Sequence, residues 1–147
     1  MQLTRAADYA VRVMIHLASL PPAARLSRAS LATAAEVPTQ FLSKVLQVLV
    51  RSRLVIAYRG TRGGFGLAVP PEQISVLTVV EAVEGPIQLN VCLTNGLGCG
   101  RQGWCPAHIV WQDAQAALTQ VLKNASIAKL ASQTVAPRQE KVVYPWN

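Results

Sequence analysis

The sequence contains little charge and no long apolar run, and both shortages exclude classes of protein. Of its 147 residues only 14% are charged while 51% are hydrophobic, so a disordered chain is not expected. No apolar stretch approaches the roughly 20 residues that a membrane-spanning helix requires. Residues 1–12 carry Arg5, Asp8 and Arg12 where a signal peptide would be apolar. We therefore expect an unprocessed, cytoplasmic chain with one domain and an extension.

Motifs of nucleotide-dependent enzymes are also missing. The glycine-rich segment 59–64 lacks the lysine and the following helix that a phosphate-binding loop requires. No pair of a nucleophile and a neighbouring base is recognisable either. The sequence therefore predicts a protein that is not an enzyme. If it is an enzyme after all, the alternative is an iron-sulfur redox protein.

Acidic residues are scarce in the first half of the chain. Up to Phe65 nine arginines and lysines face only two acids, whereas the two kinds cancel from Gly66 onward. The whole net charge of +7 therefore lies in the first 65 residues, which predicts that this half binds a polyanion. Nucleic acid and anionic lipid are the candidates. Because the first predicted helix lacks the aromatic anchors of an interfacial helix, nucleic acid is favoured.

Apolar residues in the first fifty positions follow the period of three short helices. The first helix should bury a stripe made of Leu3, Ala7, Ala10, Met14 and Leu17. Ser27 suits the N-cap of a second helix that ends near residue 35, and Pro38 suits the first turn of a third that runs to about residue 52. The pattern indicates a helix-turn-helix.

The third helix and the segment after it have the features of a DNA-binding element. The helix should turn outward short polar and basic side chains that reach base edges and phosphates, namely Thr39, Gln40, Ser43 and Lys44. Residues 54–58 and 65–69 predict two strands joined by the glycine-rich turn, with Arg59 and Arg62 at its tip. A hairpin after a helix-turn-helix is the winged-helix arrangement, so we expect a mostly α fold with a small β-hairpin wing.

Residues 106–123 predict a long helix that needs a partner. Its apolar face follows a heptad-like register through Val110, Ala114, Ala117, Leu118 and Val121. Because the winged helix supplies its own core, we expect this face to form the seam of a twofold homodimer, with packing inside one chain as the alternative. The predicted organisation is a winged-helix domain at 1–84, a cysteine loop at 85–105, the dimerisation helix with a short terminal helix at 106–131, and a flexible tail at 132–147.

The three cysteines lie close together on a glycine-rich loop. Cys92, Cys99 and Cys105 cannot all pair within one chain, and their clustering favours metal or redox chemistry over a disulfide framework. Structural zinc usually shows closer spacing. Zinc, a redox thiol and an iron-sulfur cluster all remain possible from the residues alone.

Several of these segments together resemble a known family. They are the opening Met1-Gln-Leu-Thr with Asp8-Tyr-Ala-Val-Arg, the wing 59–65 followed by Leu67-Ala, and the end of the cysteine loop, Cys105-Pro-Ala-His. Over residues 1–131 the chain is similar to the Rrf-type bacterial regulators, among them IscR, NsrR and RirA. This resemblance implies a dimeric winged-helix transcriptional regulator that binds a palindromic operator in double-stranded DNA. It also implies that operator affinity depends on an iron-sulfur cluster sensing nitric oxide, redox state or cluster supply.

The resemblance implies which residues hold the cluster. Cys92, Cys99 and Cys105 match the three cluster cysteines of the family. Two residues compete for the fourth position: His108, as in IscR, and Asp8 of the partner subunit, as in NsrR. The gap between Cys92 and Cys99 is longer than in these relatives, so both 2Fe-2S and 4Fe-4S clusters stay open. A cluster-free regulator that responds to thiol oxidation or to a small ligand is the alternative.

The resemblance also implies the DNA-facing positions. They are the outward residues of the third helix and the two wing arginines named above, joined by Arg28, which is expected to contact a phosphate. Ser43 stands where IscR has an acidic residue, so a different operator sequence is expected.

Overall fold

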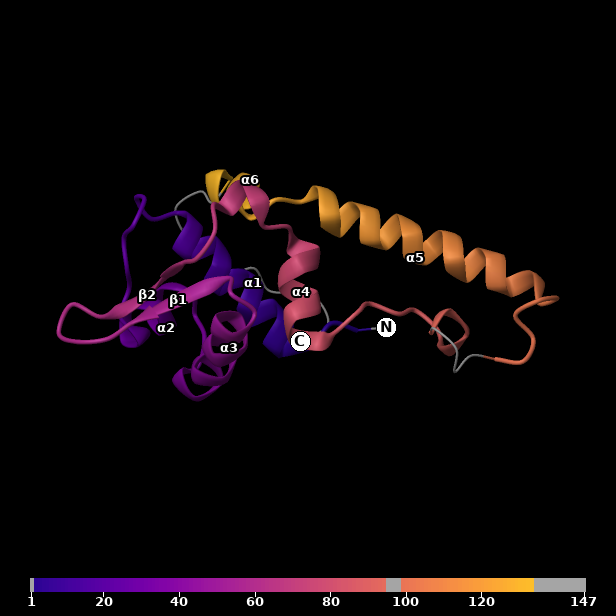
Figure 1. Ribbon diagram of the computed structural model, residues 1–147, viewed down its shortest axis with the longest axis horizontal. Coiled ribbons are helices and arrows are strands. Elements are labelled where there is room, and N and C mark those ends of the chain that lie inside the picture. Colours follow the sequence, from indigo (N-terminus) through magenta and orange to yellow (C-terminus); the bar gives the residue numbers. More distant parts are fainter. Residues whose placement is uncertain (1, 95–98, 134–147) are drawn as a thin grey trace, which may run out of the picture.

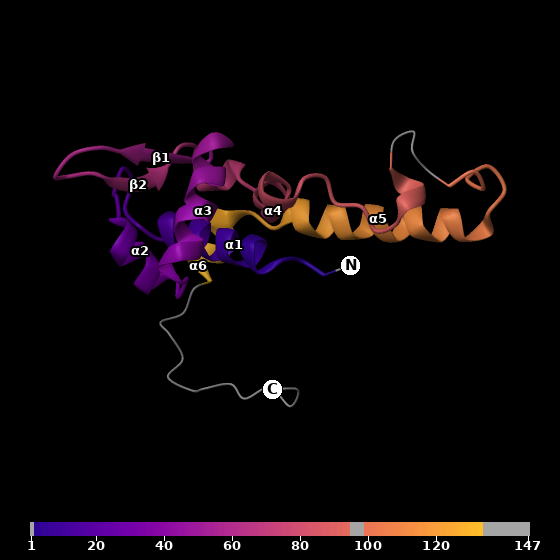
Figure 2. The same cartoon turned by 90° about the horizontal axis from the view of Figure 1, so that it is seen from below.

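The computed structural model describes residues 2–94 and 99–133, which form a helical body and a projecting arm (Figures 1 and 2). The elements are α1 (Arg5–Ala18), α2 (Arg28–Ala34), α3 (Thr39–Arg51), β1 (Val55–Tyr58), β2 (Gly64–Leu67), η1 (Pro71–Gln73), α4 (Val76–Glu84), η2 (Val91–Leu93), α5 (Pro106–Asn124) and α6 (Ile127–Ser132). The mostly α fold with a two-stranded antiparallel wing is confirmed. Most of the predicted tail lies beyond residue 133 and therefore outside the described residues.

Serine and threonine side chains begin four of the helices. Ser27, Ser75 and Ser126 each accept a hydrogen bond from the backbone N–H three residues later, as does Thr4 from Ala7. Such caps satisfy N–H groups that have no partner within the helix. Because Thr4 caps α1, the helix begins at Arg5 and Leu3 stays outside it with 41% of its surface exposed. The prediction that Leu3 belongs to the buried stripe was wrong.

The core lies entirely within the body. It is built from the inner faces of α1, α3 and α4 with single residues of neighbouring elements, and its largest fully buried side chains include Met14, Leu31, Leu42, Leu49 and Ile127. Residues of α5 are absent from this cluster in the described part of the chain. The expectation that the winged helix supplies its own core needs one correction, because Ile127 of α6 is fully buried in this cluster and completes it.

The wing is tied to the segment before α2 by close backbone contacts. Leu26 and Phe65 exchange two backbone hydrogen bonds of 3.1 and 2.8 Å, adding a bridge that the sequence pattern did not predict. Gly64 lies at φ +144°, and a Cβ atom there would stand 2.6 Å from the Leu26 carbonyl oxygen. A glycine is therefore required where the wing crosses this segment.

The arm is joined to the body at its base. The N–H of Val76 donates to the carbonyl of Ala125 and the N–H of Ile127 donates to that of Ile74, both at 2.8 Å. These bonds anchor the end of α5 beside α4, while the rest of α5 runs away from the body and the cysteine loop folds back along it (Figure 1). In the described ranges, no helix is long and apolar enough to span a membrane.

Candidate DNA-binding surface and cysteine loop

The buried apolar side chains of α3 fix the orientation of this helix on the core. Leu42, Val45, Leu46 and Leu49 are buried, and this stripe orients the helix against the core. The predicted base-reading residues Thr39, Gln40 and Lys44 are exposed as a result, and Ser43 is half-buried. Arg28, in the first turn of α2, donates a long hydrogen bond of 3.4 Å to the Ser43 hydroxyl oxygen. Arg28 and the α3 residues thus form one surface.

Wing arginines extend this surface. Arg59 and Arg62 are exposed in the turn between β1 and β2, as predicted. The guanidinium of Arg25 lies 3.4 Å from the centre of the Tyr58 ring at the end of β1, a cation–π contact that holds the wing against the preceding loop.

The positive charge of this surface is not neutralised within the protomer. In residues 2–94 and 99–133 the only side-chain ion pair joins Asp8 to Arg12, at 2.9 Å. The cations of α2, α3 and the wing are therefore free to meet an external polyanion. Sequence reasoning missed two of them, Arg51 and Arg53, which stand where α3 turns into the wing.

The structure brings the three cysteines into one hollow. Cys92 lies in η2, Cys99 on the loop and Cys105 at the N-cap of α5, yet all three line a cavity of about 140 Å³ together with His108. All three thiols are free, with Cys99 exposed and the other two half-buried. The folding-back of the loop along α5 therefore collects donors that are up to 16 residues apart in the sequence.

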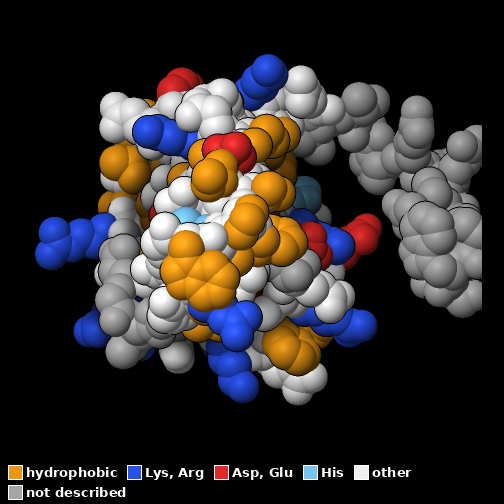
Figure 3. Space-filling model, turned by 90° about the vertical axis from the view of Figure 1, so that its right-hand side faces the viewer, with side chains coloured by type: hydrophobic (Ala, Val, Ile, Leu, Met, Phe, Trp, Pro, Cys, Tyr) orange, Lys and Arg blue, Asp and Glu red, His pale blue; other side chains and the backbone are white. Residues whose placement is uncertain are grey.

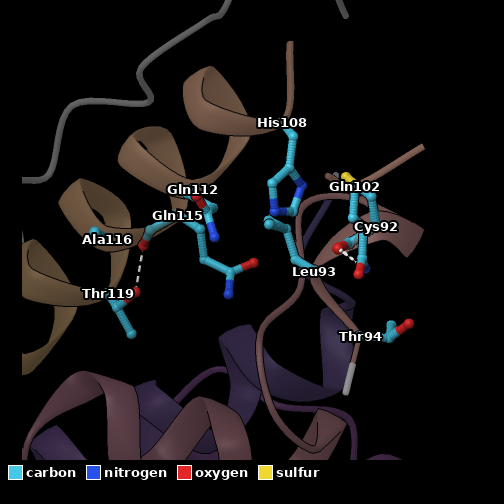
Figure 4. A pocket seen from close by; sticks show the side chains of 9 residues that line it. All are labelled: Cys92, Leu93, Thr94, Gln102, His108, Gln112, Gln115, Ala116 and Thr119. Carbon is cyan, nitrogen blue, oxygen red and sulfur yellow. Dashed lines mark hydrogen bonds between the residues drawn. The ribbon is translucent and has the colours of Figure 1, made fainter. Parts of the chain in front are cut away.

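His108 separates this hollow from a larger one. A cavity of about 420 Å³ lies between η2 and α5, and its α5 wall carries the polar side chains Gln112, Gln115 and Thr119 (Figure 4). The His108 Nδ1 atom is buried and has no hydrogen-bond partner. A buried polar atom without a partner indicates that a ligand or a water completes the site. Together with His108 these side chains recur at steps of four and three residues, a spacing that is visible in the sequence. Only the apolar heptad of this helix was interpreted from the sequence.

The donor set fits an iron-sulfur cluster, although the donors are not gathered at ligand distances. Three thiols and an imidazole are soft and borderline ligands of the kind that such clusters use. The Nδ1 atom of the His108 imidazole has no hydrogen-bond partner in the described residues. Within the described ranges, no group of three or more His, Cys, Asp or Glu side chains is close enough to hold a metal ion. Asp8 lies in the first turn of α1, does not line the cysteine cavity of its own protomer and stays a predicted ligand from the partner subunit.

The surface of α5 is apolar where it faces away from the chain. None of its 19 residues is buried, and Ile109, Val110 and Val121 are each at least 60% exposed. The predicted seam residues Ala114 and Ala117 are exposed as well, and Leu118 is half-buried. Figure 3, which views the far end of the arm, shows hydrophobic side chains gathered there. Thus α5 contributes polar side chains to the cavity beside η2 and leaves Ile109, Val110 and Val121 exposed.

Comparison with known proteins supports this description. Residues 3–133 match the Rrf2 family, described as an iron-dependent transcriptional regulator. Rv1287 of Mycobacterium tuberculosis (strain ATCC 25618 / H37Rv), whose name places it among HTH-type transcriptional regulators, is 31% identical over 89% of this chain and 81% of its own length. The HTH-type transcriptional regulator IscR of Vibrio vulnificus (strain YJ016) is 27% identical over 90% of this chain and 78% of its own.

Solved structures share the fold. CymR (YrzC), described as the global cysteine regulator of B. subtilis, superposes with a TM-score of 0.76 at 23% identity, over 92% of this chain and 99% of CymR. IscR of T. potens superposes with a TM-score of 0.73 at 22% identity, over 90% of this chain and 88% of its own. The predicted resemblance is thereby confirmed, and the chain belongs to the Rrf2 family of transcriptional regulators.

Proposed function

We propose that this Rrf2-family regulator binds a palindromic operator as a homodimer and that an iron-sulfur cluster on the cysteine loop controls its affinity. The observation that carries the proposal is the hollow lined by Cys92, Cys99, Cys105 and His108 on a protein with a DNA-binding fold. Thiolates are the ligands that such clusters require, and Cys92, Cys99 and Cys105 reach this hollow from η2, from the loop and from the N-cap of α5.

In this proposal the body contacts DNA and the arm forms the dimer. The exposed residues Thr39, Gln40 and Lys44 of α3 would contact bases and phosphates, while Arg59 and Arg62 of the wing would contact the backbone or the minor groove. The outward apolar face of α5 would pack against its copy, because an unpaired face of this kind is unfavourable in water. Two copies would present two recognition helices to the two half-sites of a palindrome.

Regulation would pass from the cysteine loop to the arm. When bound, the cluster supplies a centre that changes with nitric oxide, redox state or iron-sulfur supply. Cys105 is the N-cap of α5 and His108 lies in its first turn, so any rearrangement of these ligands moves the start of the arm. A shift of α5 against its copy would change the separation of the two recognition helices, and with it the fraction of dimers that fit the operator.

A thiol-based regulator is the second candidate, and a specific observation favours it. The three thiols are free and share one cavity, but in the described part of the chain they are not gathered as a metal site. A solved relative with this fold is described as a global cysteine regulator rather than as an iron protein. Oxidation of these thiols could move α5 in the same way.

Anaerobic purification with iron and sulfide analysis distinguishes the two candidates. The cluster proposal expects a visible charge-transfer band with iron and sulfide in equal amounts, lost in Cys99→Ser and Cys105→Ser. Whichever of Asp8→Ala and His108→Ala alters the band identifies the fourth ligand. Gln112→Ala is the matched control, because Gln112 neighbours His108 on α5 but does not line the cysteine cavity. A colourless protein that binds DNA and loses affinity on thiol oxidation would overturn the cluster proposal and support the second candidate.

A further inference from the structure

Two hollows flank strand β1 where α3 ends. One, of about 460 Å³, has Arg28, Gln47 and Arg51 on its walls, and the other, of about 450 Å³, has Arg53 and Arg59. They share Val50 and Ala57 as part of their lining. The hollows therefore form one depression between the recognition helix and the wing, with four arginines around it.

The charge of this depression is unopposed. Neither hollow is lined by an acidic side chain. Across the described residues, the side chains of Arg51 and Arg53 are exposed and take part in no hydrogen bond, ion pair or ring contact. Because a guanidinium carries five donors, two such groups at one depression are suited to an anion with several acceptor oxygens.

The backbone at Arg53 supplies an independent observation. Arg53 lies at φ +59°, in the left-handed region that glycine adopts far more readily than arginine. Its N–H bonds the carbonyl of Val50 and the next N–H, that of Leu54, bonds Leu49, both at 3.0 Å, which is the helix ending where glycine is the usual residue. This ending places the Arg53 side chain on the wall of the depression, where it has no partner in the described part of its own chain.

The position of the depression identifies that partner. In a duplex, the strand of phosphates separates the major groove from the adjacent minor groove. If α3 lies in the major groove and the wing reaches the minor groove, the sugar-phosphate backbone between these grooves must run between α3 and the wing. We propose that the depression between α3 and the wing binds the phosphodiester backbone of DNA, with Arg51 and Arg53 as its principal contacts. This inference rests on the proposed DNA binding and extends it to two residues that position the duplex and do not read its bases.

The salt dependence of DNA binding tests the proposal, because each lost phosphate contact removes one counterion-release step. A duplex selected from a random library with the wild-type protein serves as the probe, in fluorescence anisotropy titrations over a series of salt concentrations. Because a homodimer carries two copies of each arginine, Arg51→Gln and Arg53→Gln should each reduce the slope of log K against log salt by about 1.8, and at 0.1 M salt weaken binding at least roughly tenfold. Arg51→Lys should keep the wild-type slope, since a phosphate contact needs the charge and not the planar group.

A matched control removes a positive charge elsewhere. Lys129→Gln changes the exposed lysine of α6, on an element that lines neither hollow, and should leave the slope unchanged. Arg53→Gly should lower the slope as Arg53→Gln does while raising the melting temperature by roughly 2 °C, because it relieves the backbone. A lower salt dependence together with a higher melting temperature would not arise if Arg53 had only a structural role.

Two outcomes overturn the inference and can be told apart from failure of the proposed function. If the affinity of the wild-type protein for the selected duplex falls steeply with salt and both glutamine variants show the same slope, the depression does not bind phosphate. If the same variants lose binding only to vesicles containing 30% phosphatidylglycerol, the depression binds an anionic membrane surface. A wild-type protein that selects no duplex would contradict the proposed DNA binding itself.

Discussion

Glu36 ends α2 in a backbone conformation that suits glycine. Its φ is +53°, and the N–H of Val37 bonds the carbonyl of Ala32 at 3.0 Å to close the helix. Glu36→Gly should raise the free energy of unfolding by about 0.5–1 kcal/mol, because the relieved strain exceeds the added freedom of the unfolded chain. Urea denaturation would measure this, with Glu36→Ala as the control that keeps the Cβ atom. Equal stability of all three proteins would contradict the strain argument.

Gly64 is the residue at which the wing is most sensitive to a single added atom. In Gly64→Ala the new Cβ would meet the backbone of Leu26, which cannot move without breaking its bridge to Phe65. We expect a loss of about 2–3 kcal/mol in the free energy of unfolding and weaker DNA binding. Gly100→Ala is the control, because a Cβ there meets nothing within 4 Å. A Gly64→Ala protein as stable as this control would show that the wing can shift freely.

Single residues also show where sequence reasoning succeeded and where it could not. The caps Ser27, Ser75 and Ser126 were predictable, since a capping side chain acts on backbone only three residues away. Glu36 and Arg53 could not be identified as helix-ending residues, because neither is the glycine that usually signals such an ending. Each residue sits where backbone hydrogen bonds close its helix, from the N–H of Val37 to Ala32 after α2 and from the N–H of Leu54 to Leu49 after α3.

At the scale of elements, α5 lines a cavity of its own chain with polar side chains while several of its apolar side chains stay exposed. The heptad of apolar residues was legible in the sequence, but the sequence could not say which face would meet the cysteine loop. That is decided by the folding-back of the segment before η2, where the N–H of Leu89 donates to the Gln115 side-chain oxygen at 3.0 Å. Gln112, Gln115 and Thr119 therefore line a cavity, while Ile109, Val110 and Val121 remain exposed.

Placing a charge on the outward face of α5 should dissociate the dimer. Val110→Glu would bury two unpaired carboxylates at a twofold seam, so the dimer dissociation constant should rise by at least roughly a hundredfold. Gln112→Glu adds the same charge on the inward polar face and should leave the dimer intact. Sedimentation velocity over a range of concentrations would separate the two variants. A Val110→Glu protein that remains dimeric would place the interface elsewhere.

At the scale of the whole molecule, the helix-turn-helix with its wing and the cysteine loop occupy opposite ends of an elongated protomer (Figure 1). The sequence predicted both ends, because their residues are consecutive or nearly so. That Cys92, Cys99 and Cys105 lie together with His108 was implied by the family resemblance and not by their spacing, since it depends on the loop lying along α5. The depression between α3 and the wing was missed because its arginines come from α2, from the end of α3 and from the wing, which only the fold brings together.

Because each protomer carries one recognition helix, the spacing of operator half-sites should be as important as their sequence. A dimer joined through α5 holds its two recognition helices at a fixed separation, which on B-DNA corresponds to half-sites about one helical turn, or a multiple, apart. Inserting five base pairs between the half-sites rotates one of them to the opposite face of the duplex. Affinity should then fall to that of an isolated half-site, whereas five base pairs added outside the palindrome should change nothing. Equal affinities in a titration of the two duplexes would mean that the protomers bind independently, and that the arm does not couple them.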